Sequence, residues 1–330
     1  MTGRMIVNLK PSSWIACNVY VSAGKMVSRN FLCDLLSNAQ KEARDVAVVH
    51  AFADGPYDRS SFHFAGCSRE MVSIVSKLAC DAMSYIPPHI QDGTRHPTVG
   101  KVDHISIMPL HVNTCCDSEG MEGEEASNTD IIKNHCVPAA HEIGQIISSY
   151  TNQSCQVLYY GYANEEQLPL AKIRKLKTHF FNSSNPNNNK NNDLSGEEND
   201  MCIIGVPPNF VENVNIRLRS GVTKKDAIQH VTKYVRSRDG GILSHVEALT
   251  LPYGPQQYEV ACNLINPNIT KMEDVQKLIL QKQKENNHDM VEAIYRVGTT
   301  VDQCIQVLSQ DMNQRQKHNE FIMKQFREFF

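Results

Sequence analysis

The order of strand and helix patterns constrains the fold of this chain more than any single residue does. Runs rich in β-branched residues predict strands, and apolar residues spaced three and four apart predict helices. In the first half of the chain, these patterns predict, in order, a strand at 16–22, a helix at 28–44, strands at 46–52 and 61–65, a helix from 68 that ends by 87, and a strand at 102–110. This βαββαβ series predicts two helices covering one face of a four-stranded antiparallel sheet.

A similar series returns in the second half of the chain. A helix at 130–150, a strand at 155–162 and a helix at 170–176 extend the first unit. The second unit is predicted as strands at 201–206 and 214–218, a helix at 223–235, a hairpin of 245–251 and 258–265, and a helix at 272–283. We therefore predict an α+β fold of two tandem ferredoxin-like subdomains with a ligand cleft between them.

Composition shifts divide the chain further. The asparagine-rich segment 182–200 and the acidic segment 115–127 are poor in apolar residues, so both are predicted to be disordered. After a short helix at 301–308, the tail carries aromatic and charged residues that can form an amphipathic helix, docked on the protein body or on another subunit. The predicted division is an N-terminal subdomain at 1–181, an insert at 182–200, a C-terminal subdomain at 201–309 and an extension at 310–330.

Composition also limits the partners. A formal net charge of -3 over 330 residues offers no broad basic surface, so neither nucleic acid nor membrane is an expected partner. The 11 cysteines form no CxxC pair or regular framework, which predicts reduced thiols and a cytoplasmic location. The apolar run at 5–7 is too short for a signal peptide, and no stretch reaches the length that spans a bilayer. A small polar ligand is the natural partner.

His96 is the strongest candidate for chemistry. Pro97 restricts the residue before it, so the backbone of His96 is predicted to be extended and its ring direction to be limited. Gly100 lets the chain turn into the strand that follows. An imidazole has an ordinary pKa of about 6.5, so it can take or give a proton at cellular pH. No metal site is predicted, because His63 and His104 do not form an established zinc spacing with His96.

Several motifs, taken in order, resemble the formiminotransferase module. His96-Pro97-Thr98-Val99-Gly100 is similar to the family's His-Pro-Arg-hydrophobic-Gly loop, and the turn at 54–62 is similar to a loop that carries an arginine, here Arg59. Leu158-Tyr159-Tyr160-Gly161 resembles the family's Leu-Tyr-Gly strand end, and Ile173-Arg174 resembles a pair in the helix after it. The strand at 258–264 looks like that of plant-type members.

The resemblance implies transfer of a formimino group from N-formimino-L-glutamate to N5 of tetrahydrofolate. Tetrahydrofolate would be a co-substrate, no metal would be needed, and His96 would be the catalytic acid and base. Both substrates carry carboxylates, for which Arg59 and Arg174 are the candidate cations. The other implied substrate-binding or folate-binding positions are Asp54, Gly100, Tyr160, Gly161, Asn215 and Asn263. The resemblance also suggests a homodimer and a plant-type stand-alone member without a cyclodeaminase domain.

Two positions beside His96 depart from the family pattern, and the loop at 20–24 lacks an acidic residue that is common in the family. Thr98 stands where arginine usually follows His-Pro, and Arg95 replaces an acidic or small residue before the histidine. Three functions are therefore open: an active transferase, a folate-binding module without catalysis that acts as a carrier or regulator, and an interaction domain without a small ligand. Turnover that is lost in His96→Ala identifies the first, and folate binding without turnover identifies the second.

Overall fold

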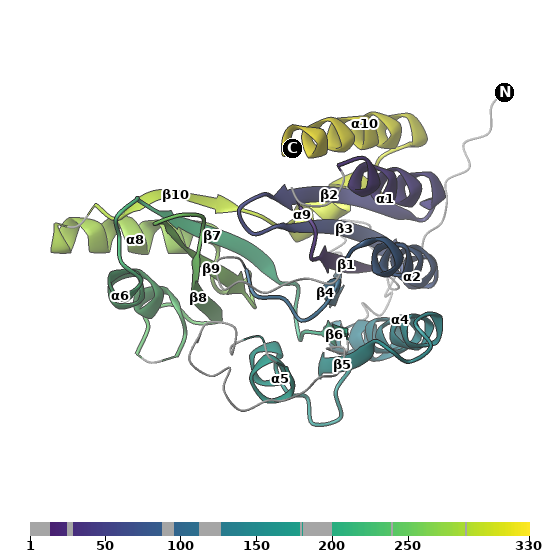
Figure 1. The fold of residues 1–330 in the computed structure, drawn as a ribbon, viewed down its shortest axis with the longest axis horizontal. Helices are drawn as coiled ribbons and strands as arrows, with labels where there is room; N and C mark the ends of the chain where they lie inside the picture. The colour runs from purple at the N-terminus through teal and green to yellow at the C-terminus, as the bar shows by residue number, and fades with distance from the viewer. Residues whose placement is uncertain are drawn as a thin grey trace, which may run out of the picture.

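The computed structural model describes residues 14–24, 29–87, 96–111, 127–178, 180, 200–238, 240–287 and 289–330. These residues form an α+β structure with two β-sheets (Figure 1). Apart from Ser127 and Asp200, the two segments predicted to be disordered lie outside the described residues, as does Arg95. Within the described residues, we find no helix whose length and apolar character would let it cross a membrane.

Six strands form the larger sheet, in the order β2-β3-β1-β4-β6-β5. They are β1 (Trp14–Val21), β2 (Val46–Asp54), β3 (Arg59–Cys67), β4 (Val102–Pro109), β5 (Gln156–Gly161) and β6 (Met201–Val206). Strands β1 to β4 pair with one another in antiparallel fashion, whereas β6 runs parallel to both β4 and β5. The larger sheet is therefore mixed, and its first four strands follow the predicted βαββαβ series.

The placement of β6 corrects the predicted division of the chain. We expected this strand to open the second subdomain, but it lies between β4 and β5 and pairs with both. The physical reason is burial, because Cys202, Ile204 and Val206 join the main core of the larger sheet. The other limits of the predicted division stay predictions.

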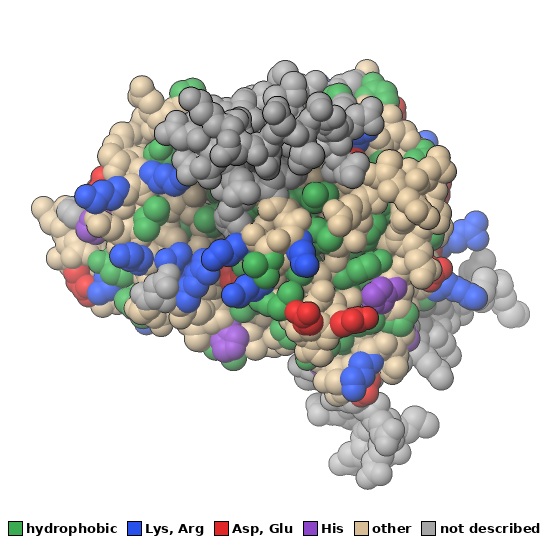
Figure 2. Space-filling model, turned by 60° about the horizontal axis from the view of Figure 1, so that its bottom comes forward, with side chains coloured by type: hydrophobic (Ala, Val, Ile, Leu, Met, Phe, Trp, Pro, Cys, Tyr) green, Lys and Arg blue, Asp and Glu red, His purple; other side chains and the backbone are tan. Residues whose placement is uncertain are grey.

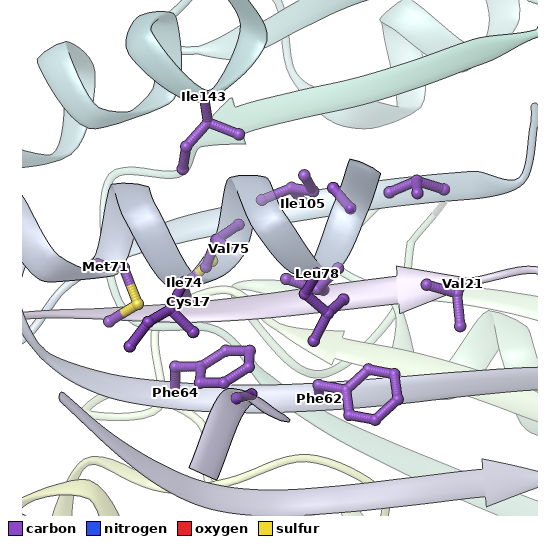
Figure 3. Packing of buried hydrophobic residues seen from close by; sticks show 14 of the residues in the cluster. Cys17, Val21, Phe62, Phe64, Met71, Ile74, Val75, Leu78, Ile105 and Ile143 are labelled. Atoms are coloured by element: carbon purple, nitrogen blue, oxygen red, sulfur yellow. The ribbon is translucent and has the colours of Figure 1, made fainter. Parts of the chain in front are cut away.

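Helices on one face of the larger sheet build the main core. They are α1 (Arg29–Glu42), α2 (Ser68–Tyr85) and α4 (Val137–Tyr150). In Figure 3, Phe62 and Phe64 of β3 lie against the α2 side chains, among them Leu78. Strand alternation sends every second residue of β1 into this core, because Cys17, Val19 and Val21 are fully buried there. The intervening residues of β1 therefore face the other side of the sheet.

Two helical segments contain a π-helical turn, which the sequence pattern did not predict. Each is one continuous helical stretch in which five residues adopt wider hydrogen bonding. The first comprises α3 (Asn128–Ile131), η2 (Ile132–Cys136) and α4; the second comprises α6 (Lys224–Ala227), η4 (Ile228–Thr232) and α7 (Lys233–Val235). Ser127 begins the first stretch with a capping box, so this residue is an ordered helix cap.

Four strands form the smaller sheet, in the order β10-β7-β9-β8. They are β7 (Glu212–Leu218), β8 (Val246–Pro252), β9 (Tyr258–Leu264) and β10 (Val291–Arg296). All the neighbouring pairs are antiparallel, and α8 (Met272–Asn286) and the α6–α7 segment bury a separate core against the sheet. Strand β10 was not predicted, because most of its side chains are half-buried and it lacks a clear alternation.

Three further helices pack around the larger sheet. They are α5 (Leu170–Lys177), α9 (Val301–Leu308) and α10 (Met312–Glu328). Helix α9 packs on the face opposite α2, where Cys304 and Val307 meet Trp14. Helix α10 lies beside α1 and β2, with Ile322 and Phe326 buried in the main core (Figure 1). The predicted amphipathic tail is therefore confirmed as a helix that docks on the protein body.

Candidate functional site

The face of the larger sheet that points away from α1 and α2 carries a row of polar side chains. The row follows the strand pairing across the sheet and consists of His50, His63, Asn18, Ser106 and Tyr160, with Gly205 between the last two. Asn18 and His63 are only 3% and 1% exposed, so these polar groups are sealed from water. The hydroxyl of Tyr20 on the same face donates to Asn213 Oδ1 of the smaller sheet at 2.9 Å. The polar face therefore lies where the two sheets meet.

A β-bulge places one carboxylate in this polar region. In the pairing of β1 with β4, Tyr20 is opposite His104 and Val21 is opposite Val102, so Asp103 is an extra residue. Its side chain is fully buried and accepts hydrogen bonds from Arg59 Nη2 at 2.6 Å and from Arg174 Nη2 at 3.1 Å. Two guanidinium groups thus share a single carboxylate, and one positive charge remains.

Asp103 also ties the His96 loop to the charged cluster. Its Oδ1 accepts a hydrogen bond from the backbone N–H of Val99 at 3.0 Å. Burial alone would raise the pKa of Asp103, but the charges of Arg174 and Arg59 outweigh it and hold that pKa well below its usual range. Asp103 is therefore ionised at pH 7.

His96 lies beside this cluster with a defined tautomer. Its Nδ1 is 2.7 Å from the carbonyl oxygen of Pro97, which can only accept, so Nδ1 carries the hydrogen and Nε2 carries the lone pair. The half-buried ring meets Tyr57 at 5.3 Å and Phe180 at 5.9 Å between centroids, both edge to face. Loss of water around the ring, and then the charge of Arg59, lower the pKa of His96 to about 3. The imidazole is neutral at pH 7.

A second histidine, His104, lies on the other side of Asp103. The hydroxyl of Tyr160 donates to Ser106 Oγ at 3.0 Å, so its oxygen accepts from His104 Nε2 at 3.1 Å. Tyr20 stacks on His104 with centroids 5.6 Å apart, and Arg59 Cζ lies 4.3 Å from the Tyr20 ring centre. Burial lowers the pKa of His104 to about 3. This imidazole is also neutral at pH 7.

The smaller sheet contributes a second charged cluster. Arg217 Nη2 donates to the hydroxyls of Tyr253 at 2.5 Å and Tyr295 at 2.6 Å, and its Nε is 3.3 Å from Glu259 Oε1. Asn215 donates to the other oxygen of Glu259 at 2.7 Å. Here one guanidinium meets one carboxylate, so the charges compensate.

The structure brings three of the predicted site residues together and distributes the others around them. Arg59 and Arg174 meet at Asp103, the charges of all three act on the ring of His96, and Tyr160 contacts the same region through His104. Asn263 accepts a hydrogen bond from Asn213 Nδ2 at 2.8 Å and so belongs to the link between the sheets.

Asp54 is the last residue of β2, just before the turn that leads to β3. Its Oδ1 accepts from the backbone N–H of Tyr57 at 3.0 Å, which shapes the turn that holds the Tyr57 ring beside His96. Burial raises the pKa of Asp54 to about 6. Asp54 therefore supports the site through the backbone of this turn.

The two predicted glycines are explained by close backbone approach. A Cβ at Gly100 would lie 2.1 Å from the carbonyl oxygen of Met201, and a Cβ at Gly161 would lie 2.1 Å from that of Val206. Gly161 also has a φ of +59°, which side chains disfavour. Both glycines let β6 pack closely against an adjacent segment of the same polypeptide, so their observed role is packing.

Several residues of the site were not predicted from the sequence. They are Tyr20, Tyr57, Asp103, His104, Phe180, Arg217, Tyr253 and Glu259. One signal was present, since Asp103-His104 interrupts an otherwise apolar strand, and a charged residue in such a strand needs a partner. The aromatic residues carried no local signal, because their role depends on contacts between the two sheets.

The surface near α5 is basic. Figure 2 brings the lower side of Figure 1, where α5 lies, towards the viewer and shows Lys and Arg side chains grouped on it. The last turn of α5 contains Arg174, Lys175 and Lys177. Arg174 is buried and points to Asp103, whereas the two lysines are exposed. An anionic ligand that approaches from this side meets positive charge.

Comparisons with known proteins point to one family. The family model for the N-terminal subdomain of the formiminotransferase domain matches residues 14–206, which end at the last residue of β6. A formiminotransferase cyclodeaminase-like protein from Arabidopsis thaliana is 24% identical over 314 residues, covering 88% of this chain and 94% of the relative. A crystal structure described as a protease from Helicobacter pylori covers 96% of this chain and 88% of its own, at 9% identity. Its TM-score of 0.23 is too low to inform the fold or the function.

Proposed function

Because this chain belongs to the formiminotransferase family, we propose that it transfers a formimino group from N-formimino-L-glutamate to N5 of tetrahydrofolate. The observation that carries the proposal is the state of His96. Its Nδ1–H is committed to the Pro97 carbonyl, which leaves the Nε2 lone pair free of that bond, and the charges of Arg59 and Arg174 act on the ring. This arrangement suits a group that accepts a proton next to a bound anion.

Proton transfer is the central demand of the proposed reaction. As N5 of tetrahydrofolate forms a bond to the formimino carbon, N5 gives its hydrogen to His96 Nε2. When the bond from that carbon to the glutamate nitrogen breaks, His96 Nε2 gives this hydrogen to the departing nitrogen. One neutral imidazole can perform both steps in turn, and glutamate leaves as the free amine.

The residual positive charge supports binding of a carboxylated donor. Arg59 and Arg174 carry two charges against one on Asp103, so a substrate carboxylate would complete the balance. The same carboxylate would offset the charges that lower the pKa of His96. Substrate binding would thus oppose the part of the shift in the pKa of His96 that these charges cause, whereas burial of the ring, the larger cause, continues to lower that pKa.

The proposal extends to the architecture around the site. The strand order β2-β3-β1-β4 in the larger sheet is repeated as β8-β9-β7-β10 in the smaller one, which supports two ferredoxin-like subdomains. We place the ligand cleft between these sheets, near the hydrogen bond from Tyr20 to Asn213. A homodimer in the cytoplasm remains part of the proposal.

The test is a transferase assay with purified protein, N-formimino-L-glutamate and tetrahydrofolate. We expect turnover in the wild type and a loss of at least about 100-fold in His96→Ala, in line with removal of a general acid and base. His141→Ala, on the α4 helix, is the matched control because His141 contacts Tyr159 outside the charged cluster. Equal turnover in His96→Ala and the wild type would overturn the assignment of His96.

One observation favours a second candidate, a folate-binding module without catalysis. Thr98 is buried at the position where the family pattern has arginine, and both arginines of the site are already paired with Asp103. Calorimetry separates the two candidates. Equal tetrahydrofolate binding by the wild type and His96→Ala, with no turnover by either, would identify a carrier or regulator.

A further inference from the structure

Two hairpin turns, one from each sheet, meet beside His96. The turn between β2 and β3 carries Tyr57, and the turn between β8 and β9 carries Tyr253. Their rings are 5.2 Å apart between centroids and nearly perpendicular, at 80°. The same Tyr57 ring meets His96 at 5.3 Å and 79°. Tyr57, which is 4% exposed, therefore lies between the imidazole and the smaller sheet.

These hairpins hold equivalent places in the two halves of the molecule. Each connects the second and third strands of a β-α-β-β-α-β series, one in β1 to β4 and the other in β7 to β10. Through the contact of Tyr253 with Tyr57, the second half of the molecule is thus connected to the site in the first half.

Arg217 holds the Tyr253 ring in place from within the smaller sheet. Its Cζ lies 4.2 Å from the Tyr253 ring centre, and its Nη2 donates to the Tyr253 hydroxyl at 2.5 Å. Glu259 compensates its charge, and Tyr295 accepts a further hydrogen bond at 2.6 Å. Because the charge is already balanced, Arg217 is better suited to brace Tyr253 than to receive a substrate carboxylate.

We propose that Tyr57 and Tyr253 are positioning residues that hold the His96 imidazole in its reacting orientation, with Arg217 as their brace. This inference rests on the proposed function. Within the described residues, the His96 ring makes one hydrogen bond, from Nδ1 to the Pro97 carbonyl. Because one hydrogen bond still allows the ring to tilt, its aromatic neighbours must restrain that motion. Small errors in the direction of Nε2 reduce proton transfer, because its efficiency depends on alignment.

Steady-state kinetics of Tyr57→Leu and Tyr253→Leu test the proposal, with both substrates varied. We expect kcat to fall at least about tenfold in each variant while both KM values stay within about twofold. Tyr57→Phe keeps the ring and should recover most of the lost kcat. A rise in KM with unchanged kcat would show that the tyrosines bind substrate, and unchanged kinetics would show no role; either result overturns the proposal.

A second measurement keeps the inference separate from the proposed function. If the wild type shows no turnover, the proposed function fails, and nitrogen NMR of the imidazoles then decides the positioning role. Tyr253→Leu should shift the His96 ring signals and leave those of His141 in place. An unmoved His96 signal would overturn the inference. Tyr253 is only half-buried, so this variant also serves if Tyr57→Leu does not fold.

Discussion

The two arginine clusters of this molecule differ in charge balance. In the larger sheet, Arg59 and Arg174 share the single carboxylate of Asp103, and in the smaller sheet Arg217 faces the carboxylate of Glu259. The first cluster keeps one uncompensated positive charge, whereas the second is neutral. The difference shows that similar residue types serve two purposes: the first cluster is suited to attract an anion, and the second is suited to hold side chains in place.

Removing the carboxylate of Asp103 should give the largest difference in stability between the two clusters. Asp103→Asn leaves the buried guanidinium of Arg174 and the half-buried one of Arg59 without a counter-charge, so we expect the free energy of unfolding to fall by about 3–5 kcal/mol. Glu259→Gln should cost less, about 1–3 kcal/mol, because the Arg217 side chain is 26% exposed and can reach water. Urea unfolding measures both values. Equal losses would contradict the difference between the clusters.

Acid should destabilise the larger sheet through its buried histidines. Burial lowers the pKa of His50 to about 4 and those of His96 and His104 to about 3, below the ordinary value of 6.5. Between that value and pH 4 the unfolded chain binds protons that the folded chain excludes, so stability falls as pH falls, by about 1.4 kcal/mol per pH unit for each histidine.

The single tryptophan, Trp14, reports on this acid effect. It is 8% exposed on β1 of the larger sheet, so its fluorescence follows unfolding of that part. We expect the urea midpoint read from Trp14 to decrease steadily from pH 7 to pH 5. A constant midpoint over that interval would show that the histidines are not held neutral by the fold.

Substrate affinity should separate the two clusters kinetically. Arg174→Gln removes the one uncompensated charge, so we expect KM for N-formimino-L-glutamate to rise about tenfold or more, as for loss of a charged hydrogen bond. Arg217→Gln should lower kcat and leave that KM within about twofold. Initial-rate measurements with the donor varied give both constants, and a larger KM effect at Arg217 would reverse the assignment.

The hydrogen-bonded link between the sheets should give the smallest effect. Asn213→Ala removes the acceptor of the Tyr20 hydroxyl and the donor to Asn263, and we expect a loss of about 1–2 kcal/mol in the free energy of unfolding. The exposed Asn268→Ala is the control. Thermal unfolding followed by circular dichroism compares the two. Equal stability of both variants would show that this link adds nothing to the joining of the sheets.

Local patterns predicted most of the individual elements. Helix α9 matches its predicted range of 301–308, and α2 ends before Pro87 as expected, because the residue before proline avoids helical backbone. The sheet that each strand joins was harder to predict. The apolar run of β6 fits either sheet by its pattern alone, and only its burial between β4 and β5 decides the matter.

The candidate site was predicted in part. His96, Arg59 and Arg174 were named from motifs, and the structure gathers them at one carboxylate. Asp103 was missed because regular alternation would place it on the same face as Ile105, within the core, and only the bulge redirects it. Tyr253 was missed because its partner, Tyr57, is distant in sequence.

The docking of α10 has a consequence for how copies of this chain can associate. Strand β2 is an outer strand, and its irregular register at Val49 leaves a carbonyl that accepts a hydrogen bond from His318 Nε2 at 3.1 Å. The C-terminal helix thus shields one border of the larger sheet from recruiting a foreign strand. Cross-chain extension of that sheet would have to begin at β5, the opposite border, so loss of the last helix would open a new route to aggregation.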